Sequence, residues 1–193
     1  MSYQIECEKR VMITFDQYQT LLSDFEGRDS FIVNEYLDNE DSQLHDERLM
    51  LRIRTIDNNP QMELTLKIKN EEGDIEVTDI ISQEEKSDII RLKQLPDGEV
   101  KRALIDRGIS TNNMIIWGYI EVNRREVEFE QSMLVIDENH IQNTIDYNIE
   151  VEAKNIKKAE KVIKNLCENY HLNYQENYLS KSRRTYMIYH GLM

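Results

Sequence analysis

The sequence has few of the residues that mark disorder, disulfide frameworks or membrane spans. It contains only 2 Pro and 6 Gly among 193 residues, which disfavours a disordered or low-complexity chain. Cys7 and Cys167 stand far apart and outside any CxxC or Cys/His spacing, which predicts two reduced thiols. No apolar run approaches the roughly 18 residues that span a bilayer, and the charged start MSYQIECEKR is unlike a signal peptide. We therefore expect a cytoplasmic protein without a membrane partner.

Basic residues are also scarce relative to acidic ones. The chain has 24 Lys and Arg against 37 Asp and Glu, a net charge of −13. A general nucleic-acid binder needs a basic face, so this class is disfavoured, whereas a small polyphosphate needs only a local basic pocket. The sequence has no Walker P-loop, GxGxxG motif or serine-hydrolase arrangement, and its 4 histidines are dispersed.

Alternation of apolar and polar residues predicts short strands over much of the chain. We expect strands at 3–13, 30–38, 48–57, 61–70, 74–81, 114–122, 123–130, 132–137 and 145–153. Turns are expected at 57–60 and 70–73, and helices at 14–25, 82–94, 99–107, 155–170 and 180–184. No linker divides residues 1–193. This pattern predicts one mainly β (α+β) domain with flanking helices, in which the strands form a barrel or a strongly curved sheet more than a parallel α/β fold.

Within several strands the charged residues share one face, because residues i and i+2 of a strand point the same way. An ordinary half-buried sheet also has one charged, solvated face, and that interpretation stays open for any single strand. It does not require acids to gather on some strands and bases on others. On the first strand Glu6 and Glu8 share a face with Arg10, and on the late strand Asp146, Asn148, Glu150 and Glu152 share one. The basic residues Arg52, Arg54, Lys67 and Lys69 lie on the second and third of the charged strands.

A closed barrel would turn both sets of charges inward, where like charges repel and lose water. A triphosphate with divalent cations would supply the missing counter-charge. Arg binds phosphate oxygens as a planar fork and Lys as a point charge, whereas Mg²⁺ or Mn²⁺ prefers carboxylate and phosphate oxygens. The chemistry would then be metal-assisted attack of water on a phosphoryl group.

Eight segments, in order along nearly the whole chain, resemble motifs of one known family. They are ECEKR at 6–10, YLD at 36–38, LRIR at 51–54, LKIK at 66–69, RREV at 124–127, VID at 135–137, DYNIEVE at 146–152 and SKSRR at 180–184. ECEKR resembles the ExExK signature of the CYTH superfamily, the triphosphate tunnel metalloenzymes, in the form found in Gram-positive bacteria. Arg10 stands where that family has Lys, and Asn148 stands where it often has Glu; both departures bear more on turnover than on phosphate binding.

The resemblance implies a closed eight-stranded antiparallel β-barrel, a tunnel with flanking helices, and a role for each matching residue. Glu6, Glu8, Glu150 and Glu152 would bind Mg²⁺ or Mn²⁺, and Glu8, Arg10 and Lys181 would act in catalysis. Phosphate would be held by Arg10, Arg52, Arg54, Lys67, Lys69, Arg124, Lys181 and Arg184, with Glu76 as a further candidate. Strand parity leaves open whether Arg124 or Arg125 faces the tunnel.

The family includes inorganic triphosphatases, thiamine triphosphatases, RNA 5′-triphosphatases and class IV adenylate cyclases. The function we expect is metal-dependent hydrolysis of inorganic tripolyphosphate or a small organic triphosphate. Two alternatives stay open: an adenylate cyclase that makes cyclic AMP and pyrophosphate from ATP, and a non-catalytic sensor that binds a polyphosphate or nucleotide. A homodimer is compatible with the sequence.

Overall fold

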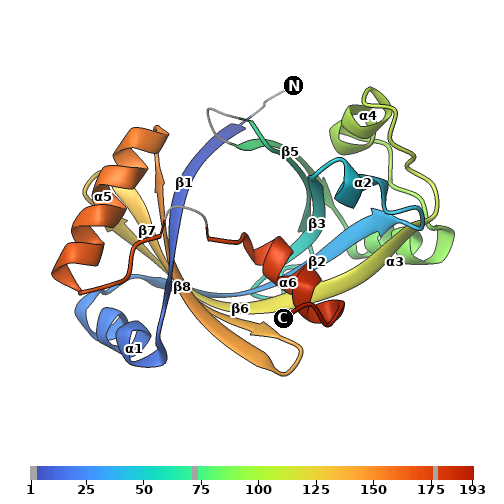
Figure 1. The fold of residues 1–193 in the computed structure, drawn as a ribbon. Coiled ribbons are helices and arrows are strands. Elements are labelled where there is room, and N and C mark those ends of the chain that lie inside the picture. The colour runs from blue at the N-terminus through green and yellow to red at the C-terminus, as the bar shows by residue number, and fades with distance from the viewer. Residues whose placement is uncertain (1–3, 71–73, 176–177) are drawn as a thin grey trace. The chain divides into compact units, whose positions relative to one another are not determined.

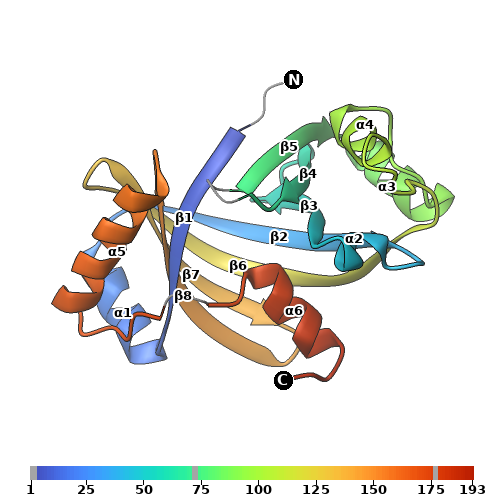
Figure 2. The same cartoon turned by 45° about the horizontal axis from the view of Figure 1, so that its top comes forward.

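A computed structural model describes residues 4–70, 74–175 and 178–193, with side chains from residue 7 onward. Figures 1 and 2 show its strands and helices. The strands are β1 (Gln4–Ile13), β2 (Arg28–Asn39), β3 (Leu49–Ile56), β4 (Met62–Ile68), β5 (Asp74–Ile81), β6 (Met114–Phe129), β7 (Ser132–Ile141) and β8 (Thr144–Ala153). The helices are α1 (Phe15–Asp24), α2 (Gln43–Asp46), α3 (Gln83–Leu92), α4 (Glu99–Ile105), α5 (Ile156–Asn169) and α6 (Lys181–Tyr189). Of the helices in this described part, none has the length and apolar character to cross a membrane.

The prediction of a mainly β fold with antiparallel strands and flanking helices is confirmed. One boundary was wrong: residues 114–122 and 123–130 are not two strands, because β6 continues without a break. The polar Asn123 and Arg124 resemble a turn signal, but they pair in register with Glu138 and Asp137 of β7. The turn expected at 57–60 lies between β3 and β4, whereas residues 71–73 of the other turn fall outside the described chain.

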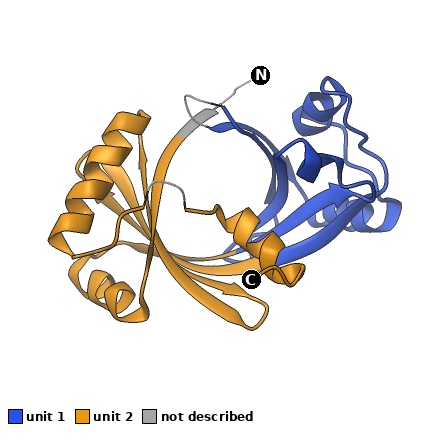
Figure 3. Ribbon diagram, in the orientation of Figure 1, with its two compact units in different colours: residues 1–5, 33–119 blue, residues 6–32, 120–193 orange. Residues whose placement is uncertain are grey.

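The chain divides into two compact units (Figure 3). Unit 1 comprises residues 1–5 and 33–119, and unit 2 comprises residues 6–32 and 120–193. Strands β1, β2 and β6 therefore contribute residues to both units.

Unit 1 is built on the antiparallel strands β3, β4 and β5, whose order continues to β2 and β6. One face of these strands is apolar and packs on α3 and α4. Asp79 of β5 fixes the start of α4, because its carboxylate accepts hydrogen bonds from the backbone N–H groups of Glu99 at 3.0 Å and Val100 at 2.8 Å. A Cβ at Gly98 would come within 2.3 Å of that carboxylate, so this approach requires glycine.

Unit 2 contains the antiparallel series β6, β7, β8 and β1. Helices α1 and α5 lie on one face of these strands, and α6 lies on the other (Figures 1 and 2). Thr14 begins α1 with a capping box that includes Gln17, as its sequence predicts. The apolar side of α5 packs into a core with alternate residues of β1, β7 and β8, including Val11, Leu134 and Ile149. The opposite residues of these strands carry the charges.

The apolar side of unit 1 should dominate its stability. Leu64 of β4 is fully buried, so Leu64→Ala should lower the free energy of unfolding by about 2–5 kcal/mol. Ile80 of β5 is 61% exposed, and Ile80→Ala should change that free energy by less than about 0.5 kcal/mol. Urea unfolding followed by circular dichroism measures both. Equal effects of the two substitutions would contradict the assignment of this core.

Candidate functional site

Pairing of β1 with β8 brings three carboxylates together in unit 2. Glu8 lies opposite Glu152, and Arg10 lies opposite Glu150. Glu8, Glu150 and Glu152 each offer one carboxylate oxygen, and these oxygens all lie within 4.8 Å of one another. Hard oxygen donors at this spacing fit the preference of Mg²⁺ or Mn²⁺, so the residues present suit such an ion.

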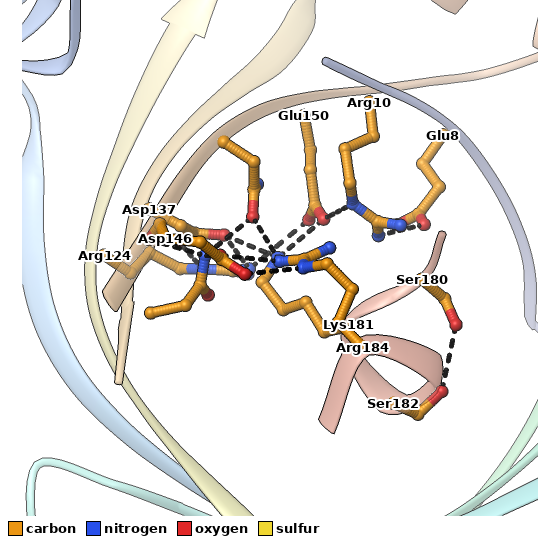
Figure 4. A network of polar contacts seen from close by, with 12 residues as sticks. Glu8, Arg10, Arg124, Asp137, Asp146, Glu150, Ser180, Lys181, Ser182 and Arg184 are labelled. Atoms are coloured by element: carbon orange, nitrogen blue, oxygen red, sulfur yellow. Dashed lines mark hydrogen bonds and ion pairs between the residues drawn. The ribbon is translucent and has the colours of Figure 1, made fainter. Parts of the chain in front are cut away.

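Arg10 lies between two of these carboxylates (Figure 4). Its Nη2 donates to Glu8 Oε1 at 2.7 Å, and its Nε donates to Glu150 Oε1. Burial alone would lower the pKa of the guanidinium, but the charges of Glu150 and Glu8 outweigh burial, so the pKa is raised. Arg10 therefore stays charged at every working pH.

A second pair, Arg124 and Asp137, is deeply buried beside the first. The guanidinium of Arg124 binds Asp137 in two parallel hydrogen bonds, Nε to Oδ1 and Nη2 to Oδ2, each 2.9 Å. Arg124 Nη2 also lies 3.5 Å from Glu150 Oε2. Burial alone would raise the pKa of both carboxyl groups. The charges of Arg124 and Lys181 outweigh burial at Asp137 and lower its pKa. Glu150 has three cations beside it, Arg10, Lys181 and Arg124, and its pKa is well below the usual value. Both acids therefore remain ionised inside the unit.

Helix α6 supplies two more cations to the same face of the strands. Lys181 and Arg184, three residues apart, project from one side of the helix. Lys181 Nζ lies 2.7 Å from Asp137 Oδ2 and 2.6 Å from Glu150 Oε1. Burial lowers the pKa of this ammonium group against the opposite influence of the two acids. Arg184 binds Asp146, with Nε to Oδ2 at 2.8 Å and Nη2 to Oδ1 at 2.9 Å.

Unit 1 carries a separate basic cluster on the face of β3 and β4 opposite the apolar core. Glu76 lies beside two of its cations, 3.0 Å from Lys67 Nζ and 3.7 Å from Arg52 Nη2. Burial would raise the pKa of Glu76, but Lys67 and Arg52 outweigh it and lower that pKa. Arg54 receives support from Asn34, whose Oδ1 accepts from Arg54 Nε at 2.9 Å. Arg52 Nε is buried and has no hydrogen-bond partner among the described residues, a free donor that suits an anion.

The structure thus gathers most of the predicted residues into these two clusters. Glu6 lies in β1, but its side chain is outside those described. Lys69 follows the end of β4 and is exposed, so its role stays a prediction. Of the two adjacent arginines, Arg124 lies with the acids, whereas Arg125 binds Asp29 at 2.7 Å beside α1.

The site residues predicted from the sequence include neither Asp137 nor Asp146, although both form ion pairs with the cations of the site. Asp137 ends the VID segment, and strand alternation places it on the face opposite Ile136, which is the charged face. The sequence does not identify its partner Arg124, because that pairing depends on the register between β6 and β7. Asp146 was assigned to the polar face of its strand without a role. Its pairing with Arg184 depends on where α6 packs, which no local pattern encodes.

Comparison with known proteins identifies the family. Residues 4–186 match the CYTH domain family. The chain belongs to this family. It is 28% identical over 179 residues to YjbK of Bacillus subtilis (strain 168), whose name makes it a candidate triphosphatase; the match covers 91% of this chain and 92% of YjbK. The relative comes from a Gram-positive bacterium, as the resemblance implied.

Two solved structures share the fold of this CYTH chain. A candidate adenylate cyclase from Bacillus halodurans has a TM-score of 0.86 and 26% identity, covering 95% of this chain and 98% of its own. HpAC1 from Hippeastrum, a candidate adenylyl cyclase described as having a dominant triphosphatase activity, has a TM-score of 0.80 and 20% identity. That match covers 94% of this chain and 95% of HpAC1.

The buried acids should make stability depend on pH in a defined direction. The pKa of Asp137 is lower in the folded state than in the unfolded chain, where it is about 3.9. Ionised Asp137 therefore adds to the free energy of unfolding above about pH 3.9, and this addition is lost as the pH falls through the pKa of the folded state. Asp137→Asn should therefore flatten the loss of stability below about pH 4. It should also cost about 3 kcal/mol near neutral pH, because Arg124 and Lys181 lose their partner.

Urea unfolding at several pH values between about pH 3 and pH 7 tests this expectation. The matched control is Asp41→Asn, which removes an exposed carboxylate. This variant should match the parent both in stability near neutral pH and in the loss of stability at low pH. If Asp137→Asn loses stability at low pH as steeply as the parent does, ionisation of Asp137 does not contribute to the pH dependence of folding.

Proposed function

We propose that this CYTH protein is a metal-dependent triphosphatase that hydrolyses inorganic tripolyphosphate or a small organic triphosphate. In this proposal residues 1–193 form one domain, and the eight strands close into an antiparallel barrel. The observation that carries the proposal is the carboxylate group of Glu8, Glu150 and Glu152, beside the cations Arg10 and Lys181. The name of the relative YjbK agrees with this activity.

The metal would be Mg²⁺ or Mn²⁺, held by Glu8, Glu150 and Glu152. Glu6 is a further candidate ligand from its place in the ECEKR segment. Such an ion supplies neutralisation of the phosphate charge and activation of water. The protein's own cations would orient the terminal phosphoryl group: Arg10, Lys181, Arg124 and Arg184 from unit 2. Lys181 is a catalytic candidate because burial lowers its pKa, which makes a proton on Nζ easier to transfer to a leaving oxygen.

The basic cluster of unit 1 would bind phosphate. Arg52, Arg54 and Lys67 present guanidinium and ammonium donors, with Lys69 as a further candidate. The free Nε of Arg52 is the best-placed donor, because a buried N–H without a partner gains a full charge-assisted hydrogen bond from a phosphate oxygen.

Glu8→Gln tests the metal-dependent reaction. Loss of one carboxylate charge should lower phosphate release from tripolyphosphate by about 100-fold or more. The assay measures orthophosphate from tripolyphosphate, ATP and thiamine triphosphate with Mg²⁺, with Mn²⁺ and with a chelator. Glu26→Gln, an exposed acid of the same unit, is the control and should keep the parent rate.

The same assay separates the alternative functions. Unchanged turnover in Glu8→Gln would contradict the assignment of the carboxylate group. Cyclic AMP and pyrophosphate from ATP would replace the triphosphatase with a cyclase. Tight polyphosphate binding without any product, under every metal condition, would make the protein a sensor.

Arg52→Gln tests whether the basic cluster of unit 1 serves the same ligand. The affinity for tripolyphosphate should fall by about tenfold or more, because a charged hydrogen bond is lost. Calorimetry with a non-hydrolysable methylene analogue of tripolyphosphate measures it directly. Arg91→Gln is the matched control, since that side chain is 68% exposed on α3. Equal affinities in both variants would exclude Arg52 from the phosphate site.

A further inference from the structure

Arg10 occupies the same carboxylates that suit a metal ion. Its guanidinium contacts one oxygen of Glu8 and one of Glu150, two of the three acids in the group. We propose that Arg10 is an internal counter-cation that holds this carboxylate group closed to a divalent ion until a polyphosphate draws the guanidinium away. This inference rests on the proposed function, since it concerns the order in which metal and polyphosphate enter that site.

The crowding around Glu150 is the first reason. Glu150 Oε1 accepts from Arg10 and also from Lys181 at 2.6 Å, and Glu150 Oε2 lies 3.5 Å from Arg124 Nη2. A divalent ion bound to this carboxylate would therefore sit next to several positive charges. At the low effective dielectric of a buried site, this repulsion is severe unless a cation moves.

Arg10 is the cation that must give way to the metal. Among the described residues, Arg10 is the cation that contacts both Glu150 and Glu8. Arg124 and Lys181 contact Glu150 too, but both are also held by Asp137. Deprotonation offers no escape, because the guanidinium of arginine stays protonated in proteins. The guanidinium has to rotate away, and a phosphate oxygen is a strong acceptor for it.

Metal and polyphosphate should therefore bind with positive coupling beyond their direct contact with each other. The anion stabilises Arg10 away from Glu8 and Glu150, which frees both carboxylates for the ion. Coupling of this kind is reciprocal, so the metal should raise the affinity for the anion by the same factor. Lysine is a single point charge and could not bridge both acids as the fork of arginine does. A lysine at position 10 should therefore couple the binding of metal and polyphosphate less strongly.

The experiment measures Mn²⁺ binding by calorimetry and electron paramagnetic resonance, without and with the methylene analogue of tripolyphosphate. Compared with the parent, Arg10→Gln should bind Mn²⁺ alone about tenfold tighter, and the analogue should enhance that binding less. Arg10→Lys should fall between the two. Direct contact between Mn²⁺ and the analogue is common to all these proteins, so the difference in enhancement reports on Arg10.

Lys9→Gln is the matched control, because it removes the same charge from the neighbouring position on β1. Lys9 lies opposite Val151 and not opposite an acid of the carboxylate group. It should bind Mn²⁺ as the parent does. Circular dichroism and urea unfolding establish that each variant is folded, and Arg10→Lys provides a charged substitute if Arg10→Gln is not.

Two negative results have different meanings. If the parent and Arg10→Gln bind Mn²⁺ alone equally and show equal enhancement by the analogue, the role of Arg10 as a counter-cation is overturned while the proposed function stands. If no protein binds Mn²⁺ even with the analogue, the carboxylate group is not a metal site, and both the proposed function and this inference fail.

Discussion

The structure of unit 2 depends on keeping Glu150 and Asp137 ionised away from water. Each would be costly to bury alone, and each is stabilised by cations from several elements: Arg10 from β1, Arg124 from β6 and Lys181 from α6. The pairing fixes the register of β1 on β8 and holds α6 against the strands. A buried ionic network contributes little net stability compared with apolar residues of similar size. The network therefore specifies how β1, β6 and α6 pack on β7 and β8 more than it adds to the free energy of unfolding.

The charges of this network nearly cancel, which determines how the site can work. Among the side chains that the structure describes, four bases, Arg10, Arg124, Lys181 and Arg184, face five acids, Glu8, Asp137, Asp146, Glu150 and Glu152. A ligand therefore has to exchange partners with groups already engaged. A polyphosphate with its metal can do so in one step, because it brings an anion for the bases and a cation for the acids. Either component alone leaves one set of charges with fewer partners than before.

Much of this arrangement could be predicted from the sequence, because strand parity is a local property. Alternation placed Glu8 with Arg10, and Glu150 with Glu152, on one face before any pairing was known. Parity could not identify the residue opposite. The pairing of Arg124 with Asp137 depends on the register of β6 and β7. The same pairing joins residues 114–122 and 123–130, expected as two strands, into the single strand β6, because Asn123 pairs with Glu138, 15 residues away. The contacts of α6 depend on long-range packing, which no local pattern encodes.

Arginine at position 10 is consistent with this exchange of partners. A lysine there would satisfy one carboxylate at a time and leave the other partly available to an ion. The planar fork of Arg10 satisfies Glu8 and Glu150 together, which makes the ligand-free network more complete and raises the cost of opening it for a metal alone. The same fork suits a phosphate oxygen, so the side chain that closes the carboxylate group is also one that the polyphosphate attracts. If Arg10 is the counter-cation that we propose, the departure from the family's lysine makes metal entry more dependent on the substrate and keeps the positive charge at this position.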